Sequence, residues 1–150
     1  MSHNTSNKIT KLYLTRSFKV TRAELFKSWT DPEEIKKWFA PGVAHIPEAS
    51  VDLRVGGHYR IHMRDDAKNA SYVATGTYRE VHPPSRLVFT WMWEGDQNSS
   101  EMLVTIELRE NGNATDLTLT HEYFPSEESK KSHEEGWAGC LDKLAHALNT

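Results

Sequence analysis

The chain has 150 residues, of which 37% are hydrophobic and 26% are charged, and its formal net charge is -3 at pH 7. This length and apolar content suffice for one domain with its own core. A net negative chain has no basic field for a phosphate backbone, so we expect no nucleic acid as a partner. No apolar run reaches the roughly 20 residues that span a bilayer, and the N-terminal sequence lacks the apolar stretch of a signal peptide. We therefore expect no membrane partner and a cytoplasmic location.

The first forty residues predict a strand and two short helices. Residues 1–7 are polar and are expected to be disordered, ahead of a single domain over residues 8–150. Alternating side chains predict a strand over Lys8–Phe18. Two capping boxes then predict helices over Arg22–Trp29 and Pro32–Trp38.

From about residue 44 the hydrophobic period changes from that of a helix to that of a strand. Six strands are predicted, joined mainly by hairpins. Their ranges are 51–55, 59–64, 71–81, 87–93, 102–109 and 114–122. Asn111-Gly112, between the last two, is a strong hairpin turn signal.

The C-terminal stretch predicts one long amphipathic helix that begins after Ser126 as N-cap and ends near Asn149. Six residues recur at steps of three and four and therefore share one face of this helix: His133, Trp137, Cys140, Leu141, Leu144 and Leu148. Cys140 is expected to be a small buried hydrophobe. Gly136 and Gly139 are costly inside a helix, and they indicate either a close approach of another backbone or a locally loose helix.

This order of elements predicts an α+β fold in which a curved antiparallel sheet wraps around the final helix. The first strand would close one side of the sheet, and the two short helices would lie across one end. A bent sheet and a straight helix do not fit flush everywhere, so a ligand cavity is expected between them.

Several motifs occur in a familiar order along the chain. They are Trp29-Thr30-Asp31-Pro32-Glu33, Asp52-x-Arg54-x-Gly56-Gly57, Gly76-x-Tyr78-x-Glu80-Val81, Pro83-Pro84-x-Arg86-Leu87-Val88-Phe89-Thr90-Trp91-x-Trp93 and His133-x-x-Gly136-Trp137. Together they resemble the bacterial proteins similar to the C-terminal domain of the activator of heat-shock protein 90 (Hsp90) ATPase, the AHSA-like family. The resemblance extends from about Ile9 to Leu148.

The resemblance implies membership of the START-like, or SRPBCC, superfamily. Its helix-grip fold, also called birch-pollen-allergen-like, has about seven strands around a long C-terminal helix, with two short helices after the first strand. The superfamily includes carriers of hydrophobic metabolites, polyketide cyclases and co-chaperone domains. The implied partners are therefore a small hydrophobic molecule or an Hsp90-type chaperone, and the chain is expected to be a monomer or a homodimer.

The leading hypothesis is a non-catalytic domain that binds a small hydrophobic or aromatic molecule between the sheet and the helix. The residues expected to line the cavity are Trp29, Trp38, Phe39, Tyr59, Ile61, Met63, Tyr78, Phe89, Trp91, Trp93, His121, His133, Trp137, Leu141 and Leu144. Large aromatic side chains serve an ordinary core equally well. The alternatives are a module that stimulates the ATPase of an Hsp90 homologue and a cavity acid–base enzyme of the cyclase or hydrolase type.

His121 and His133 are the candidates for polar chemistry in that cavity. As a pair they could orient a ligand carbonyl or act as general acid and base. The interpretation that we favour is that His133 hydrogen-bonds locally and that His121 is half exposed. His58 and His62 would lie about 13 Å apart along a strand, too far to share one ion. We therefore expect no metal and no tightly bound cofactor.

Overall fold

The computed structural model describes residues 11–96 and 99–150. The elements in chain order are β1 (Lys11–Phe18), α2 (Arg22–Thr30), α3 (Pro32–Ile35), β2 (His45–Val51), β3 (His58–Asp65), β4 (Ala70–His82), β5 (Arg86–Trp93), β6 (Met102–Asn111), β7 (Ala114–Glu122) and α4 (Glu127–Ala147). The expectations for residues 1–7, and for a first strand that begins at Lys8, fall outside the described residues. A single domain over residues 8–150 stays a prediction.

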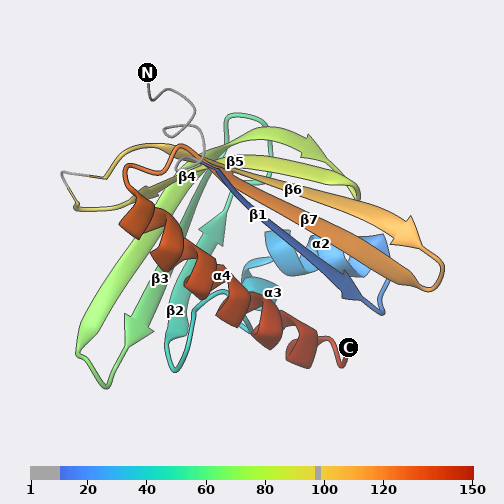
Figure 1. Ribbon diagram of the computed structural model, residues 1–150, viewed down its shortest axis with the longest axis horizontal. Coiled ribbons are helices and arrows are strands. Elements are labelled where there is room, and N and C mark those ends of the chain that lie inside the picture. The colour runs from blue at the N-terminus through green and yellow to red at the C-terminus, as the bar shows by residue number, and fades with distance from the viewer. Residues whose placement is uncertain (1–10, 97–98) are drawn as a thin grey trace.

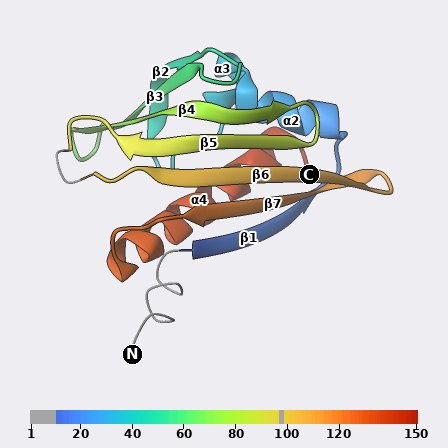
Figure 2. The ribbon, with the colours of Figure 1, turned by 90° about the horizontal axis from the view of Figure 1, so that it is seen from above.

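All seven described strands form one antiparallel sheet with the order β1-β7-β6-β5-β4-β3-β2. Figure 1 shows the sheet curving around α4, which crosses its face, with α2 and α3 nearer the C-terminal half of that helix. Seen from above, the strands lie side by side with the helices all on one side of them (Figure 2). The predicted α+β helix-grip fold is confirmed.

Each described helix begins at the N-cap that the sequence predicts. The hydroxyl of Thr21 accepts a hydrogen bond from the amide of the residue three positions on, at 3.1 Å. The carboxylate of Asp31 accepts one from the amide two positions on, at 2.9 Å. The hydroxyl of Ser126 caps α4 in the same way, at 3.0 Å. These side chains satisfy amides that have no partner inside the first turn.

The second short helix is shorter than predicted, because α3 ends at Ile35 and not at Trp38. The amides of Lys37 and Trp38 bond to carbonyls three residues back, so the last turn is tighter than an α-helix. The indole Nε1 of Trp38 donates to the carbonyl oxygen of Ser28 at 2.9 Å. This bond links the Trp38 ring to α2.

The prediction of a strand over residues 51–55 is wrong. The strand β2 covers His45–Val51, and the chain then turns. A Cβ on Gly57 would lie 2.0 Å from a backbone carbonyl oxygen, so only glycine permits this tight approach. The side chains of Leu53 and Val55 are 39% and 68% exposed. Their alternation is therefore that of an exposed turn and not that of a half-buried strand.

The core lies between the sheet and α4. From α4 the buried side chains are Trp137, Cys140, Leu141 and Leu144. They face inward-pointing residues of β7, where Leu117, Leu119 and His121 have no exposed surface. Among the described helices, none combines the length and the apolar character needed to cross a bilayer.

Candidate functional site

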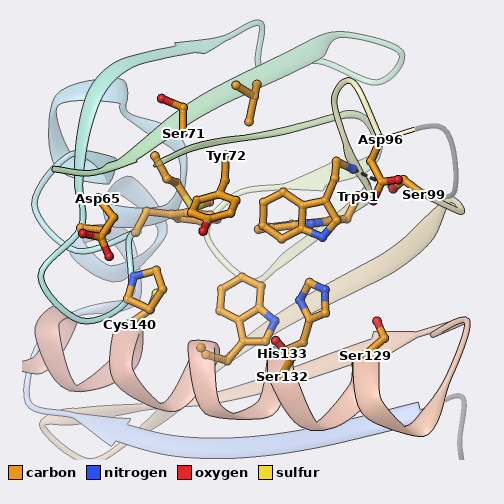
Figure 3. Close-up of a pocket in the computed structure, with 18 of the residues that line it drawn as sticks. Asp65, Ser71, Tyr72, Trp91, Asp96, Ser99, Ser129, Ser132, His133 and Cys140 are labelled. Atoms are coloured by element: carbon orange, nitrogen blue, oxygen red, sulfur yellow. Dashed lines mark hydrogen bonds between the residues drawn. The ribbon is translucent and has the colours of Figure 1, made fainter. Parts of the chain in front are cut away.

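An open cleft of about 1180 Å³ lies between α4 and the strands β3, β4 and β5. In Figure 3 the helix forms its floor and the sheet forms its roof. The large apolar side chains on its walls are Phe39, Met63, Trp91, Trp93, Met102 and Trp137. An apolar concavity of this size suits the burial of a small organic molecule.

Polar groups surround these apolar walls. In Figure 3, Asp65 and Asp96 lie at opposite ends of the opening, and Ser129 and Ser132 follow one another along α4. The charged residues that line the cleft in the described part of the chain are Asp65, Lys68, Glu94, Asp96 and Glu135. Four of these five are acidic, and although Arg60 pairs with Glu94 at 2.9 Å, the remaining charges still disfavour an anionic ligand.

Six of the fifteen residues expected at a cavity do line this cleft. They are Phe39, Met63, Trp91, Trp93, His133 and Trp137. They come from the segment after α3, from β3 and β5, and from the first half of α4. Binding of a ligand by these residues stays a prediction.

The other nine expected residues lie in the packed core and not on the cleft wall. They are Trp29, Trp38, Tyr59, Ile61, Tyr78, Phe89, His121, Leu141 and Leu144. The Trp29 and Trp38 rings pack on each other at 4.6 Å, where α2 and α3 close one end of the fold. The Tyr59 hydroxyl donates to the carbonyl oxygen of Thr90 at 2.5 Å, and burial raises its pKa well above the usual value. These nine side chains therefore lie in the interior and do not border the cleft.

His121 is fully buried, so the favoured expectation that it is half exposed is wrong. It follows Leu117 and Leu119 in the inward register of β7. Its Nδ1 accepts a hydrogen bond from Trp137 Nε1 at 3.0 Å. Burial, as the larger cause, and the nearby His133, as the smaller, lower the pKa of His121 well below its usual value. The imidazole is thus neutral with its proton on Nε2, and that atom has no partner among the described residues.

His133 is half-buried at the cleft, one helical turn before Trp137. Its ring stacks on Trp93 with centroids 5.7 Å apart and lies 4.7 Å from the His121 ring. Burial lowers the pKa of His133 to about 4. The ring is therefore neutral at pH 7 and has one donor and one acceptor nitrogen.

Trp91 is central to the cleft wall. Its ring centroid lies 5.5 Å from Trp137 and 6.0 Å from His133. The side chain is only 3% exposed, and its indole Nε1 has no hydrogen-bond partner in the described part of the chain. A buried N–H without a partner costs free energy, about 1–3 kcal/mol, that a bound acceptor would recover.

Two glycines lie inside α4 without a packing reason. A Cβ on either Gly136 or Gly139 would meet nothing within 4 Å, so the explanation by close backbone approach is wrong. Each costs about 1 kcal/mol relative to alanine inside a helix. Gly136 lines the cleft, whereas Gly139 is absent from its lining.

Comparison with known proteins places this chain in a family. The family model for the activator of Hsp90 ATPase homolog 1-like protein (AHSA1) matches residues 19–149. The chain belongs to this family. The resemblance inferred from the sequence motifs is thereby confirmed. A search of curated proteins finds no match.

Solved structures of bacterial proteins share the fold. The AHSA1 protein of Silicibacter pomeroyi is 30% identical, with a TM-score of 0.82 over 93% of this chain and 97% of its own. A protein of Nitrosomonas europaea is 28% identical, with a TM-score of 0.80 over 95% and 96% of the two chains. A protein of Chromobacterium violaceum, at 23% identity, reaches a TM-score of 0.87 over 94% and 98% and shows the fold alone.

Sequence reasoning missed part of the cleft in this AHSA1-like chain. The segment 41–44 borders the opening, and the Lys143 ammonium holds it by donating to the carbonyl oxygens of Ala40 and Ala44. Cys140 also lines the cleft; it is buried as expected, and burial raises its pKa to about 12. No sequence pattern marked these contacts, because they join segments far apart in the chain. Across residues 11–96 and 99–150, no group of three or more His, Cys, Asp or Glu is arranged to hold a metal ion.

Proposed function

We propose that the cleft binds a small, flat, apolar molecule and that binding, rather than catalysis, is its role. The observation that carries this proposal is the open cleft of about 1180 Å³ walled by aromatic rings of β5 and α4. Burial of ~300 Å² of apolar ligand surface would contribute about 7 kcal/mol before the costs of association. With no cost of association, about 7 kcal/mol corresponds to a dissociation constant of about 10 μM, so we expect weaker binding than this, with constants of tens of micromolar or above.

The chemistry at the cleft favours binding over catalysis. With a pKa of about 4, His133 is unprotonated at pH 7 but is a weak general base there. With a pKa of about 12, Cys140 is almost entirely a thiol and therefore a poor nucleophile. An acid–base enzyme remains the less favoured alternative, because its groups are poorly matched to neutral pH.

Titration with N-phenyl-1-naphthylamine, an uncharged fluorescent probe, tests the proposal. We expect saturable probe emission and quenching of tryptophan emission. Ser132→Trp places a large ring at the cleft from an exposed position of α4 and should abolish saturable binding. Lys131→Trp, at the neighbouring exposed position outside this cleft, is the matched control and should bind normally. Absence of saturable binding to the unmodified chain would contradict the proposal.

The family description supports a second candidate function, stimulation of the ATPase of an Hsp90 homologue. Such a role needs an exposed apolar contact surface. The Asp52–Gly57 turn offers one, since Leu53 and Val55 are both exposed there. Adding the chain to a bacterial Hsp90 homologue should then raise ATP turnover, and a Leu53→Ser, Val55→Ser double variant should not. Unchanged turnover with the unmodified chain would exclude this candidate.

A further inference from the structure

The position of Gly136 requires an explanation that the packing of the protein does not give. It lies in the interior of α4, where alanine would stabilise the helix, and a Cβ there would meet nothing within 4 Å. Gly139, one turn along, is open in the same way. The difference between the two is that Gly136 faces the cleft, between His133 and Cys140 on the lining. The bare backbone at Gly136 therefore widens the cleft at its floor.

A second and independent observation lies across the cleft from the helix. Trp91 is 3% exposed, and its Nε1 is a buried donor without a partner among the described residues. Figure 3 shows Trp91 between the sheet and α4, on the side of His133. The same absence of a partner holds for Nε1 of Trp29, but Trp29 does not line the cleft. Of these two indole donors, only that of Trp91 belongs to a residue that lines the cleft, and its Nε1 is covered by neighbouring side chains.

The charges at the opening restrict the ligand further. Asp65 and Glu135 line the cleft, with Lys68 as the basic side chain among its described lining residues. Glu94 also lines it, but Arg60 pairs with its carboxylate at 2.9 Å. His133 adds no positive charge at neutral pH. A carboxylate or phosphate ligand would therefore meet repulsion at the opening and no guanidinium or ammonium on the apolar walls.

We propose that the ligand is an uncharged ring compound that lies against the α4 backbone at Gly136, displaces the side chains that cover Trp91 Nε1, and accepts a hydrogen bond from that atom through a carbonyl-type oxygen. This inference rests on the proposed binding function of the cleft. It assigns two specificity determinants. Gly136 leaves the space for the ring, and Trp91 selects the polar group that the ring carries.

Two probes and two glycine variants test the contact at Gly136. The probes are Prodan, an uncharged naphthalene with a ketone, and 2-(dimethylamino)naphthalene, which lacks the ketone. Gly136→Ala and Gly139→Ala should each raise Tm, by about 2–4 °C, because both sites are open and helical. Gly136→Ala should also weaken Prodan binding about tenfold, whereas Gly139→Ala should leave it unchanged. Equal affinities for the two variants would overturn the assignment of Gly136.

The donor is tested with a matched pair of tryptophan variants. The unmodified chain should bind Prodan about five- to tenfold more tightly than the probe without the ketone. Trp91→Phe should remove this preference, whereas Trp29→Phe, which also loses a buried unpaired indole, should keep it. A retained preference in Trp91→Phe would overturn the assignment of Trp91. If that variant does not fold, the carbonyl stretching frequency of Prodan bound to the unmodified chain decides, since a frequency equal to that in hexane would exclude the bond.

The outcomes separate the inference from the proposed function. If neither probe binds the unmodified chain, the binding function itself fails. If both bind with equal affinity and neither variant at the cleft alters binding, the function stands and the two specificity assignments fail.

Discussion

The indole Nε1 of Trp137 lies 3.0 Å from Nδ1 of His121 and donates a hydrogen bond to it in the interior of the protein. This bond joins α4 to β7 next to the cleft. It fixes the imidazole in its neutral form, because a protonated Nδ1 could not accept. It also holds the Trp137 ring against Trp91, with centroids 5.5 Å apart.

We predict that His121 and Trp137 are energetically coupled. Removing one partner leaves the other as an unpaired buried group, which costs about 1–3 kcal/mol of unfolding free energy. His121→Leu and Trp137→Phe should each destabilise the protein, and the double variant should lose less than the sum. The measurement is a double-mutant cycle by urea unfolding. Strict additivity would contradict the coupling.

The free energy of unfolding should decrease as the pH drops below about 6.5, because of the buried histidines. In the unfolded chain His133 titrates near its usual pKa of 6.5, whereas burial lowers the folded value to about 4. Between these values the unfolded chain binds more protons, so the folding free energy contributed by neutral His133 is complete above pH 6.5 and is lost as pH falls towards 4. The loss from His133 is on the order of 3 kcal/mol. The depressed pKa of His121 acts in the same direction.

Urea unfolding between pH 4.5 and pH 7.5 measures this dependence. His133→Gln should flatten the slope of unfolding free energy against pH. His58→Gln, which replaces an exposed histidine of β3, is the control and should leave the slope unchanged. Parallel slopes for the His133 variant and the unmodified protein would refute the assignment.

Gly76→Ala should destabilise the protein strongly. A Cβ at this position of β4 would lie 2.0 Å from the Thr90 carbonyl oxygen and 2.8 Å from its Oγ1. That Oγ1 also accepts a hydrogen bond from the Thr77 amide at 2.9 Å, so the neighbouring strand cannot move away freely. We expect a loss of about 3 kcal/mol or more. Gly139→Ala should shift the denaturation midpoint in the opposite direction, and a neutral Gly76→Ala would refute the close approach.

Cys140 should react very slowly with Ellman's reagent while the protein is folded. It is 4% exposed, and burial raises its pKa to about 12. At pH 8 the thiolate fraction is then smaller than that of a free cysteine by a factor on the order of a thousand. The rate measured in buffer should be lower by at least this factor than the rate in guanidinium chloride. Comparable rates in the two conditions would show that the thiol is accessible.

The sequence predicted most elements because their signals are local. Capping side chains set the helix starts, and alternation placed Leu117, Leu119 and His121 on one inward face of β7. The prediction of a strand over residues 51–55 was wrong because alternation alone does not reveal the turn that backbone contacts at Gly57 impose. Local patterns describe a segment but not what packs against it.

The cleft was harder to predict for the same reason. The sequence indicated a cavity between sheet and helix, yet it could not distinguish Trp91 on the wall from Trp29 in the core. Both are buried tryptophans, and their difference depends on where α2 meets the end of the sheet. Likewise, the exposure of His121 depended on Trp137, which lies on another element and supplies its hydrogen bond.

The pairing of β1 with β7 has a consequence for biosynthesis. Leu12 lies opposite His121 in the sheet, so β1 finds its partner strand only after about a hundred further residues have been synthesised. Hairpins from β2 to β7 can form in order as the chain emerges, but β1 must wait, and α4 is made later still. The floor of the cleft is thus synthesised after the sheet that roofs it, and a nascent chain that still lacks α4 has no site at which to capture a ligand.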